Sequence, residues 1–321
     1  MRVGIVHTAG SPCGCAEAVA GGLKALGHEM FIVDSEDILL RAEELAATCD
    51  LIIDHTDTFL GWGALRPFVR WELEKCGARV VGSPAQACFL ADDKIDAKRS
   101  LNVAGVPTPP GAAVTEATAE LPPRLRPPLI LKPACEHMSR GVTLAETLEE
   151  ARVAIGALLE SYRQPVLVEI FIPGRELAVS VLDSPEGLVV LPILEWLPGG
   201  AEYRILTEAF KLQETRAVRE DAHRIILSPA RQQELESLSR KAFRTLGLKD
   251  YGRFDVRLSP DEKFYFLEAN TTPSLETGEA LALSARWAGV DYVHLVERLL
   301  EIAQHRYGVD LRTNKTVIAN Y

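Results

Sequence analysis

Short apolar segments alternate with helical patterns along the first 88 residues of the chain. The apolar segments are MRVGIVH, HEMFIVD, DLIID and ARVV, and amphipathic helical patterns separate them. Strands that alternate with helices form parallel βαβ units, so this part is predicted to be a doubly wound α/β domain. A small ligand is expected at the loops HTAGSPCGC and DHTDTFLGWG, which follow strands. Because Gly10 and Gly14 do not form G-x-G-x-x-G, no nucleotide is expected there.

Mixed α+β patterns replace this alternation after residue 88. The Pro-rich connector AELPPRLRPP leads into the strands LILKPA, GVTLAE and PVLVEIFI, with a helix expected at 148–162. Longer strands follow, ELAVSVLD, GLVVLPILEW, YGRFDVRLS and KFYFLEAN, with helices expected at 229–246 and 290–307. A chain of 321 residues exceeds one ordinary core. We therefore expect an N-terminal domain at 1–88, a central domain at 89–175 and a C-terminal domain at 176–321.

Charge and hydropathy exclude two classes of partner. The net charge of −10 argues against nucleic acids and anionic membranes. No apolar run approaches the roughly 20 residues of a membrane span, and Arg2 leads directly into a strand rather than into a signal peptide. The expected location is the cytoplasm. The six cysteines include a C-x-C pair, Cys13 and Cys15, but no spacing typical of zinc or redox sites, so they are interpreted as thiols of a reducing compartment.

The segments YGRFDVRLS and KFYFLEAN are separated by Pro-Asp-Glu and are predicted to form an antiparallel hairpin. Residues i and i+2 share a face of a strand, so Arg253 points with Asp255, and Glu268 points with Asn270. Oxygen ligands of this kind suit Mg²⁺, which completes its shell with water and phosphate oxygens. The alternative is a solvated polar face.

Two lysines indicate an anion. Lys132 ends the apolar strand LILKP, where a buried charge is costly unless it faces an opposite charge. Lys94 opens a helix after Ala-Asp-Asp, and the turn ACEHMSRGV, with Ser139 and Gly141, is of the type that wraps phosphates. For Lys132 a surface position is the alternative.

In this order the elements resemble the ATP-grasp family, and within it the D-alanine–D-alanine ligases. The resemblance rests on Asp93-Lys94 and on GVPTP, LILKPACEHMSRGV, VLVEIFIPGRE, GRFDVRL, FLEANTTP and ALSARWAGVDY, which span residues 82 to about 300. It implies a three-domain architecture in which ATP is held between two α+β subdomains. The cofactors it implies are ATP and Mg²⁺, with Mn²⁺ as an alternative ion.

The resemblance also implies roles for individual residues. Phosphates would contact Lys94 and Lys132, under a loop that contains Ser139. Adenine would be read by Glu169 and the backbone from Ile170 to Ile172, and the ribose by Glu176. Metal ions would be held by Asp255, Glu268 and Asn270.

For the reaction, the resemblance implies a carboxylate that attacks the γ-phosphorus of ATP, and an amine that then displaces phosphate from the acyl phosphate. Arg253 would face the tetrahedral intermediate. Lys211, in EAFKLQET, would contact the γ-phosphate. No covalent enzyme nucleophile is needed.

Two segments depart from the family pattern. Counted from Asn270, Ser274 stands where the family has Gly, and Glu279 stands where it has a Ser that binds the carboxylate of the acceptor. A carboxylate at 279 would repel that group and favour an amine without an adjacent carboxylate. Alternatively, Glu279 turns outward or pairs with Arg286.

The N-terminal loop departs as well. Ser11 stands where the family has an acid that grips an ammonium group. His55 is either the counterpart of a family histidine or a surface residue.

Three functions therefore remain open. The favoured one is an ATP-dependent carboxylate–amine ligase with a diverged substrate pocket, acting on a small-molecule acid and amine. The second is a D-alanine–D-alanine ligase of peptidoglycan precursor synthesis, and the third is a non-catalytic ATP-binding sensor or scaffold. The resemblance further implies a homodimer formed through the first domain.

Overall fold

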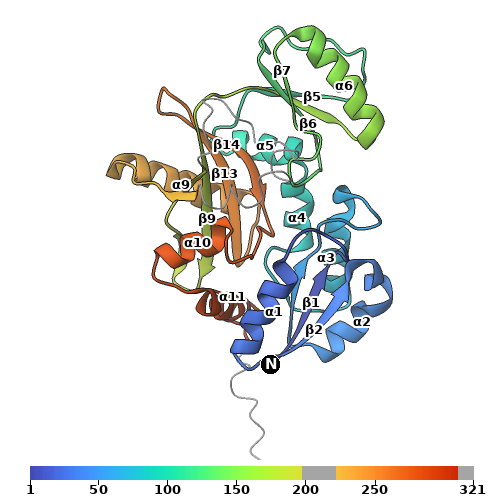
Figure 1. Ribbon diagram of the computed structural model, residues 1–321, viewed down its shortest axis with the longest axis vertical. Helices are drawn as coiled ribbons and strands as arrows, with labels where there is room; N and C mark the ends of the chain where they lie inside the picture. The colour runs from blue at the N-terminus through green and yellow to red at the C-terminus, as the bar shows by residue number, and fades with distance from the viewer. Residues whose placement is uncertain (197–221, 310–321) are drawn as a thin grey trace, which may run out of the picture.

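The computed structural model describes residues 1–196 and 222–309. Three lobes follow one another in this part of the chain (Figure 1). The N-terminal lobe holds a parallel sheet of order β2-β1-β3-β4. Its strands are β1 Arg2–His7, β2 Glu29–Asp34, β3 Leu51–His55 and β4 Val80–Val81. Its helices are α1 Cys15–Ala25, α2 Ile38–Thr48 and α3 Arg66–Lys75, with short 3-10 turns η1 Ser35–Asp37 and η2 Gly63–Leu65. The predicted doubly wound unit is confirmed.

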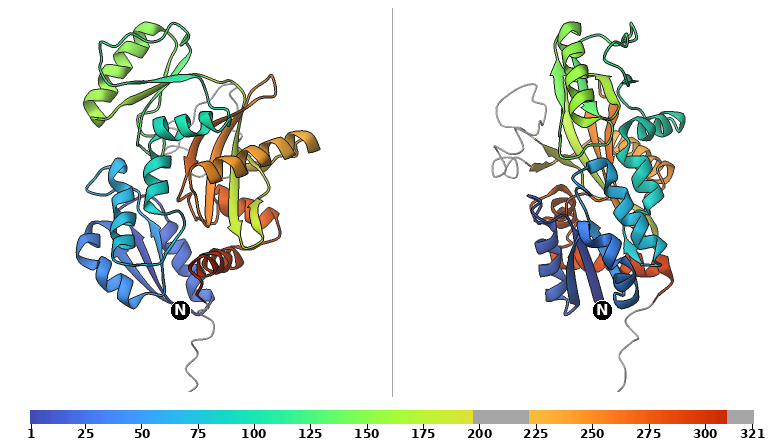
Figure 2. Two further views of the ribbon diagram at one scale, coloured as in Figure 1. Left: turned by 180° about the vertical axis from the view of Figure 1, so that it is seen from behind. Right: turned by 90° about the vertical axis from the view of Figure 1, so that its right-hand side faces the viewer.

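The central lobe is a small antiparallel sheet of order β5-β8-β6-β7, covered by α6. Its elements are β5 Gly111–Val114, β6 Leu129–Pro133, β7 Thr143–Ala145, α6 Leu148–Tyr162 and β8 Val166–Ile170. The side chain of Thr147 accepts a hydrogen bond from the N–H of Glu150 and so caps α6. This lobe lies at the opposite end of the molecule from the N-terminal lobe in all three views (Figure 2).

The third lobe holds a larger sheet of order β12-β11-β9-β13-β14, with β10 also paired to β9. Its strands are β9 Arg175–Ser184, β10 Gly187–Val190, β11 Leu194–Trp196, β12 Ala222–Arg224, β13 Tyr251–Leu258 and β14 Phe264–Asn270. Its helices are α9 Pro229–Thr245, α10 Ala280–Trp287 and α11 Tyr292–Tyr307. The predicted β13–β14 hairpin is confirmed.

The single strand predicted for GLVVLPILEW is wrong. It is divided into β10 and β11, which pair antiparallel with different parts of β9. Pro192 lies in the interruption and has no N–H to give to a sheet. Leu191 still donates a hydrogen bond to the carbonyl of Ser180, so the chain stays beside β9.

Hydrophobic packing joins segments far apart in the sequence. Helices α4 Ala85–Asp92 and α5 Lys94–Val103 place Ala91, Ala97 and Leu101 in the core beneath β9, β13 and β14. Helix α1 packs on α11, where Gly22 lies so close to Val296 that an added Cβ would be 2.9 Å from Cγ2. The N-terminal and C-terminal lobes therefore share one core, which holds the loop after β1 against the turn after β14. The domain boundaries at residues 88 and 175 stay predictions.

Candidate nucleotide and metal site

One cleft collects most of the residues that the sequence singled out. It lies between the β5–β8 sheet and the β13–β14 hairpin and encloses about 830 Å³, its open mouth included. The predicted site residues along its wall are Lys94, Lys132, Ser139, Glu169, Ile170, Ile172, Glu176, Asp255 and Glu268. A cleft lined by converging charged side chains suits a small-molecule ligand or cofactor.

Two lysines and a glutamate form a buried network beside this cleft, in which Lys132 and Glu169 line the cleft and Lys98 pairs with Glu169. Nζ of Lys98 lies 2.6 Å from Oε1 of Glu169, and Nζ of Lys132 lies 2.9 Å from Oε2. Burial opposes ionisation of Glu169, but the two lysines outweigh it and lower the pKa of the carboxyl. Burial lowers the pKa of Lys98 to about 8, whereas at Lys132 burial is outweighed by Glu169 and Glu268, which raise the pKa. The surface alternative for Lys132 is wrong.

Lys94 is held at the start of α5 in the same cleft. The Asp93 carboxylate caps that helix by accepting from the N–H groups of Ile95 and Asp96. Nζ of Lys94 donates to the carbonyl of Glu136, and burial lowers the pKa of this lysine. A buried cation facing a cleft is suited to an anionic ligand.

The loop between β6 and β7 has an unusual backbone. Met138 and Ser139 have φ values of 56° and 61°, and Gly141 has 71°. A Cβ on Gly141 would lie 2.8 Å from Pro133 and 2.9 Å from Tyr162, so this position requires glycine. Left-handed residues in such turns can direct backbone N–H groups toward an anion.

The strand end after β8 supplies few free amides. The N–H of Ile170 donates to Pro110 O at 2.9 Å, and that of Phe171 donates to Pro128 O at 3.0 Å. Only Ile172, of the three, remains as a candidate amide donor to an adenine edge. Glu176 also lines the cleft, and its carboxylate lies 2.8 Å from Arg257.

The proposed metal ligands meet across the hairpin. Asp255 is directly opposite Glu268, and Arg253 is opposite Asn270, just before a bulge at Asp255/Val256. Nδ2 of Asn270 donates to Asp255 at 3.2 Å. Burial raises the pKa of Asp255, and the facing Glu268 adds to the rise. Two carboxylates that oppose each other and an amide oxygen fit a hard divalent cation.

Arg253 lies next to these residues. Its Nε and Nη2 donate to Asp255 at 2.7 and 2.9 Å. The side chains of Arg253 and Asp255 are 17% and 16% exposed, so the alternative of a solvated polar face is wrong. Arg253 is therefore placed beside the proposed metal ligands.

Ser11, His55 and Ser274 lie elsewhere, where the N-terminal lobe meets the turn after β14. The Ser11 hydroxyl donates to Asp57. His55 is only 6% exposed, so its surface alternative is wrong, and its ring interacts with Cys15. Oγ of Ser274 lies 3.3 Å from Sγ of the same cysteine. Cys15 thus links two predicted substrate residues.

Glu279 and Lys211 are the remaining predicted residues. Glu279 is half-buried directly before α10, and its charge contributes to the raised pKa of Arg253. Lys211 lies outside the described residues.

Sequence reasoning assigned no role to four residues that the fold places at these sites. They are Cys15, Lys98, Arg257 and Glu276. Of these four residues, only Lys98 could have been found from the sequence, because it lies one helical turn after Lys94 and so on the same face of the helix. The other three acquire their partners from segments about 80 residues or more away in the chain.

Comparison with known proteins gives one consistent result. The family model described as "D-ala D-ala ligase C-terminus" matches residues 103–301. A D-alanine–D-alanine ligase of Thermotoga maritima is 31% identical over 294 residues, which cover 91% of this chain and 92% of that protein. The corresponding enzyme of Marinomonas sp. is 32% identical over 301 residues, with 90% of each chain covered.

Solved structures agree in fold. The D-alanine–D-alanine ligase of Bacillus anthracis, in a complex with ATP, superposes with a TM-score of 0.78 at 20% identity and covers 96% of this chain and 99% of that one. At this identity the match concerns the fold alone. No described helix is long and apolar enough to cross a membrane.

Proposed function

The chain belongs to the D-alanine–D-alanine ligase family of ATP-grasp proteins and is an ATP-dependent ligase that forms a carbon–nitrogen bond, and on this premise we propose that it joins a small carboxylic acid to an amine in a diverged substrate pocket. The observation that carries the ATP half of the proposal is the convergence of Lys94, Lys132 and Ser139 with Asp255 and Glu268 in one cleft.

ATP would lie in this cleft with its phosphates at Lys94 and Lys132. The buried positions of both lysines support this role, because a phosphate can replace part of the hydration that burial removes. Glu169 would keep the Lys132 ammonium in place through their 2.9 Å ion pair and face the adenine. Glu176 would bind the ribose, and the N–H of Ile172 the ring edge.

Asp255, Glu268 and Asn270 would hold Mg²⁺. When bound, the ion neutralises charge on the polyphosphate so that a carboxylate can approach it. Arg253 would stabilise the negative charge that develops on the acyl oxygen of the tetrahedral intermediate, because Asp255 holds its guanidinium next to the proposed metal ligands. Lys211 is retained in the proposal as a contact of the γ-phosphate.

The acceptor pocket is the diverged part of the proposal. Glu279 lies near enough to Arg253 to affect its ionisation, so a carboxylate would sit where an acceptor approaches. Such a site favours an amine without an adjacent carboxylate. Ser11, His55 and Ser274 would belong to the wider substrate site, with Ser11 at the position where the family grips an ammonium group.

A second candidate is a D-alanine–D-alanine ligase in the strict sense. The two relatives of this name described above are 31% and 32% identical over about nine-tenths of the chain, which supports it. In that case Glu279 would be accommodated without effect on the acceptor.

The test is the release of ADP and phosphate with Mg·ATP across a panel of L- and D-amino acids, dipeptides and simple amines. Turnover with another acid–amine pair supports the diverged ligase. Turnover with D-alanine alone supports the second candidate. ATP binding without ADP formation on any panel member contradicts both and favours a sensor or scaffold.

The exposed surface of the N-terminal lobe supports the proposed homodimer. Leu39, Leu60, Phe68 and Trp71 line one apolar depression and are 44–63% exposed. A second copy of the chain would cover this surface. Phe68→Glu should shift sedimentation toward the monomer, and a monomeric parent protein would contradict the assignment.

A further inference from the structure

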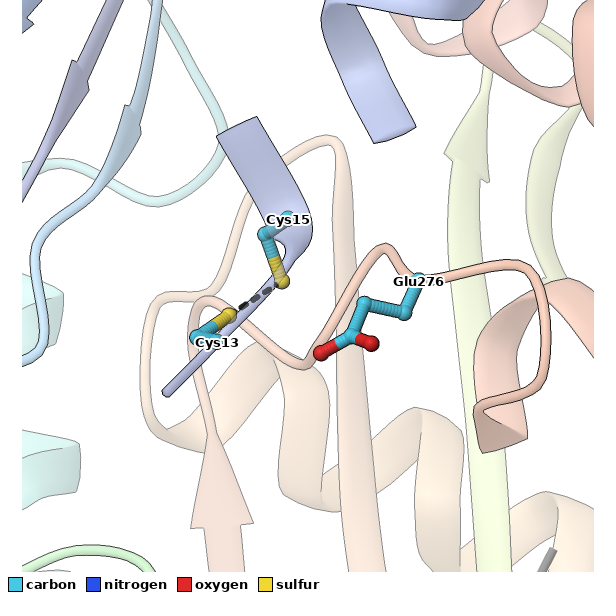
Figure 3. Close-up of side chains that lie close together, drawn as sticks. All are labelled: Cys13, Cys15 and Glu276. Carbon is cyan, nitrogen blue, oxygen red and sulfur yellow. Dashed lines mark hydrogen bonds between the residues drawn. The ribbon is translucent and has the colours of Figure 1, made fainter. Parts of the chain in front are cut away.

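Cys13 and Cys15 meet Glu276 between the N-terminal lobe and the turn after β14 (Figure 3). One ligand atom from each residue lies within 4.8 Å of those of the other two. The two sulfurs are 2.7 Å apart, and both side chains point toward the region of the Glu276 carboxylate. The two thiols and the carboxylate are thus brought together by segments about 260 residues apart.

The backbone around this group is fixed by both lobes. The N–H of Gly14 donates to Oε1 of Glu276 at 3.0 Å, and the N–H of Leu275 donates to Sγ of Cys15 at 3.3 Å. The Tyr292 hydroxyl of α11 donates to the carbonyl of Leu275 at 2.8 Å, which anchors the turn. Hydrogen bonds from both lobes therefore hold the cluster in place next to their shared core.

His55 provides an independent sign of a missing partner. The residue is 6% exposed, and its Nε2 is buried without a hydrogen-bond partner among the described residues. Its ring interacts with Cys15 from the end of β3. A buried imidazole nitrogen without a partner is costly, and metal coordination is one way to satisfy it.

We propose that Cys13, Cys15 and Glu276 bind a thiophilic divalent cation of the Zn²⁺ type, and that His55, whose ring interacts with Cys15, moves toward them to complete the ligand set. Thiolates select such ions over Mg²⁺, and a mixed set of sulfur, imidazole and carboxylate suits tetrahedral Zn²⁺. The site is chemically distinct from the oxygen ligands of Asp255 and Glu268. An ion there would tie the loop after β1 to the turn after Asn270.

The ligand spacing requires one adjustment. Two sulfurs on one tetrahedral Zn²⁺ are separated by about 3.8 Å, so the thiols must move apart by about 1 Å. Cys13 precedes α1 in a loop and is half-buried, which allows its side chain to rotate.

The experiment measures Zn²⁺ binding to the full chain under a reducing agent, with excess Mg²⁺ and no ATP, by competition with a chromogenic chelator. One tight site is expected, and Cys13→Ser or Cys15→Ser should weaken it by at least about 10–100-fold. Glu276→Gln keeps an oxygen for Gly14 and should weaken binding less. Cys76→Ser removes a half-buried thiol outside the cluster and should leave binding unchanged.

Co²⁺ provides a readout that does not depend on any variant. The parent protein should show thiolate-to-cobalt charge-transfer absorption, which disappears when Zn²⁺ is added. Absence of this absorption, or Zn²⁺ binding that persists in the Cys13→Ser/Cys15→Ser double variant, overturns the proposal. Equal weakening by Cys76→Ser overturns it as well, because binding would then be unspecific.

Discussion

Lys98 of α5 and Glu169 of β8 form a buried ion pair, with 2.6 Å between Nζ and Oε1. The lysine is also 3.4 Å from the carbonyl of Phe266 on β14, so it contacts both the β5–β8 sheet and the β13–β14 hairpin. It is part of the support for Glu169, and through Glu169 for Lys132. The pair therefore links the stability of the protein to the arrangement of the proposed phosphate site.

The first prediction concerns the pH dependence of stability. Burial lowers the pKa of Lys98 from 10.5 to about 8, so between these values the unfolded chain binds the extra proton. The destabilisation caused by the buried, protonated Lys98 side chain is complete below about pH 8 and is relieved as the pH rises toward 10.5. The free energy of unfolding, measured with denaturant, is compared between the parent and Lys98→Met. The parent value minus the variant value should rise by about 1–3 kcal/mol across this pH window. A difference that is flat or falls with pH would contradict the assignment.

The second prediction concerns Asp255. Asp255→Asn keeps the shape of the side chain but removes one of the two carboxylates that face each other across the hairpin. We expect kcat/KM for ADP formation to fall by about 10²–10³-fold, as when one catalytic charge interaction is removed. The Mg²⁺ concentration for half-maximal activity should rise. Asp261→Asn, on the exposed hairpin turn, is the matched control. Unchanged Mg²⁺ dependence in Asp255→Asn would contradict a ligand role.

The third prediction concerns the loop between β6 and β7. Gly141→Ala would place a methyl group 2.8 Å from Pro133 in a left-handed backbone, so the loop must distort. KM for ATP should rise, and the protein should lose about 1–3 kcal/mol of stability. Gly156→Ala, in the middle of α6 with open space around it, should instead gain about 0.5–1 kcal/mol. Steady-state kinetics and thermal unfolding of both variants test this prediction. If KM for ATP is the same in Gly141→Ala as in the parent, the loop does not contact the nucleotide.

The fourth prediction concerns the packing of the N-terminal lobe. Gly22→Ala brings a methyl group to 2.9 Å from Val296, so α1 and α11 must separate at a cost of about 1–3 kcal/mol. Gly21→Ala is one residue earlier on the exposed face and should stabilise by up to about 1 kcal/mol. Chemical denaturation of the two variants gives opposite signs if the lobes share a core. The same sign for both would argue against it.

The fifth prediction concerns the acceptor. Glu279→Ser removes the carboxylate that the proposal places in the acceptor pocket. The ratio of kcat/KM for an amino acid to that for an amine without a carboxylate should rise by about 10-fold or more, which is about 1.4 kcal/mol. Glu279→Gln, neutral and nearly isosteric, should shift it in the same direction. If neither variant changes the ratio, Glu279 does not face the acceptor.

Local periodicity was sufficient to predict most of the fold and half of the site. The alternation of strands and helices up to residue 88 predicted the parallel sheet, and the i, i+2 spacing placed Arg253 with Asp255. Both patterns depend on backbone geometry that spans a few residues, so they can be read without knowledge of the rest of the chain. The interruption at Pro192 was missed because the apolar run continues on both sides of it.

Only the tertiary structure decided which distant residues become partners. The sequence shows Cys13 and Cys15 as an unremarkable C-x-C pair, but the fold brings Glu276, 261 residues after Cys15, into contact distance. It also buries His55 and pairs Glu169 with lysines from α5 and β6. Such contacts depend on how the lobes pack on their shared core, and no local pattern encodes that packing. The sequence alone therefore determined the elements and the ATP-grasp chemistry, and packing between the lobes decided the charge network and the thiol cluster.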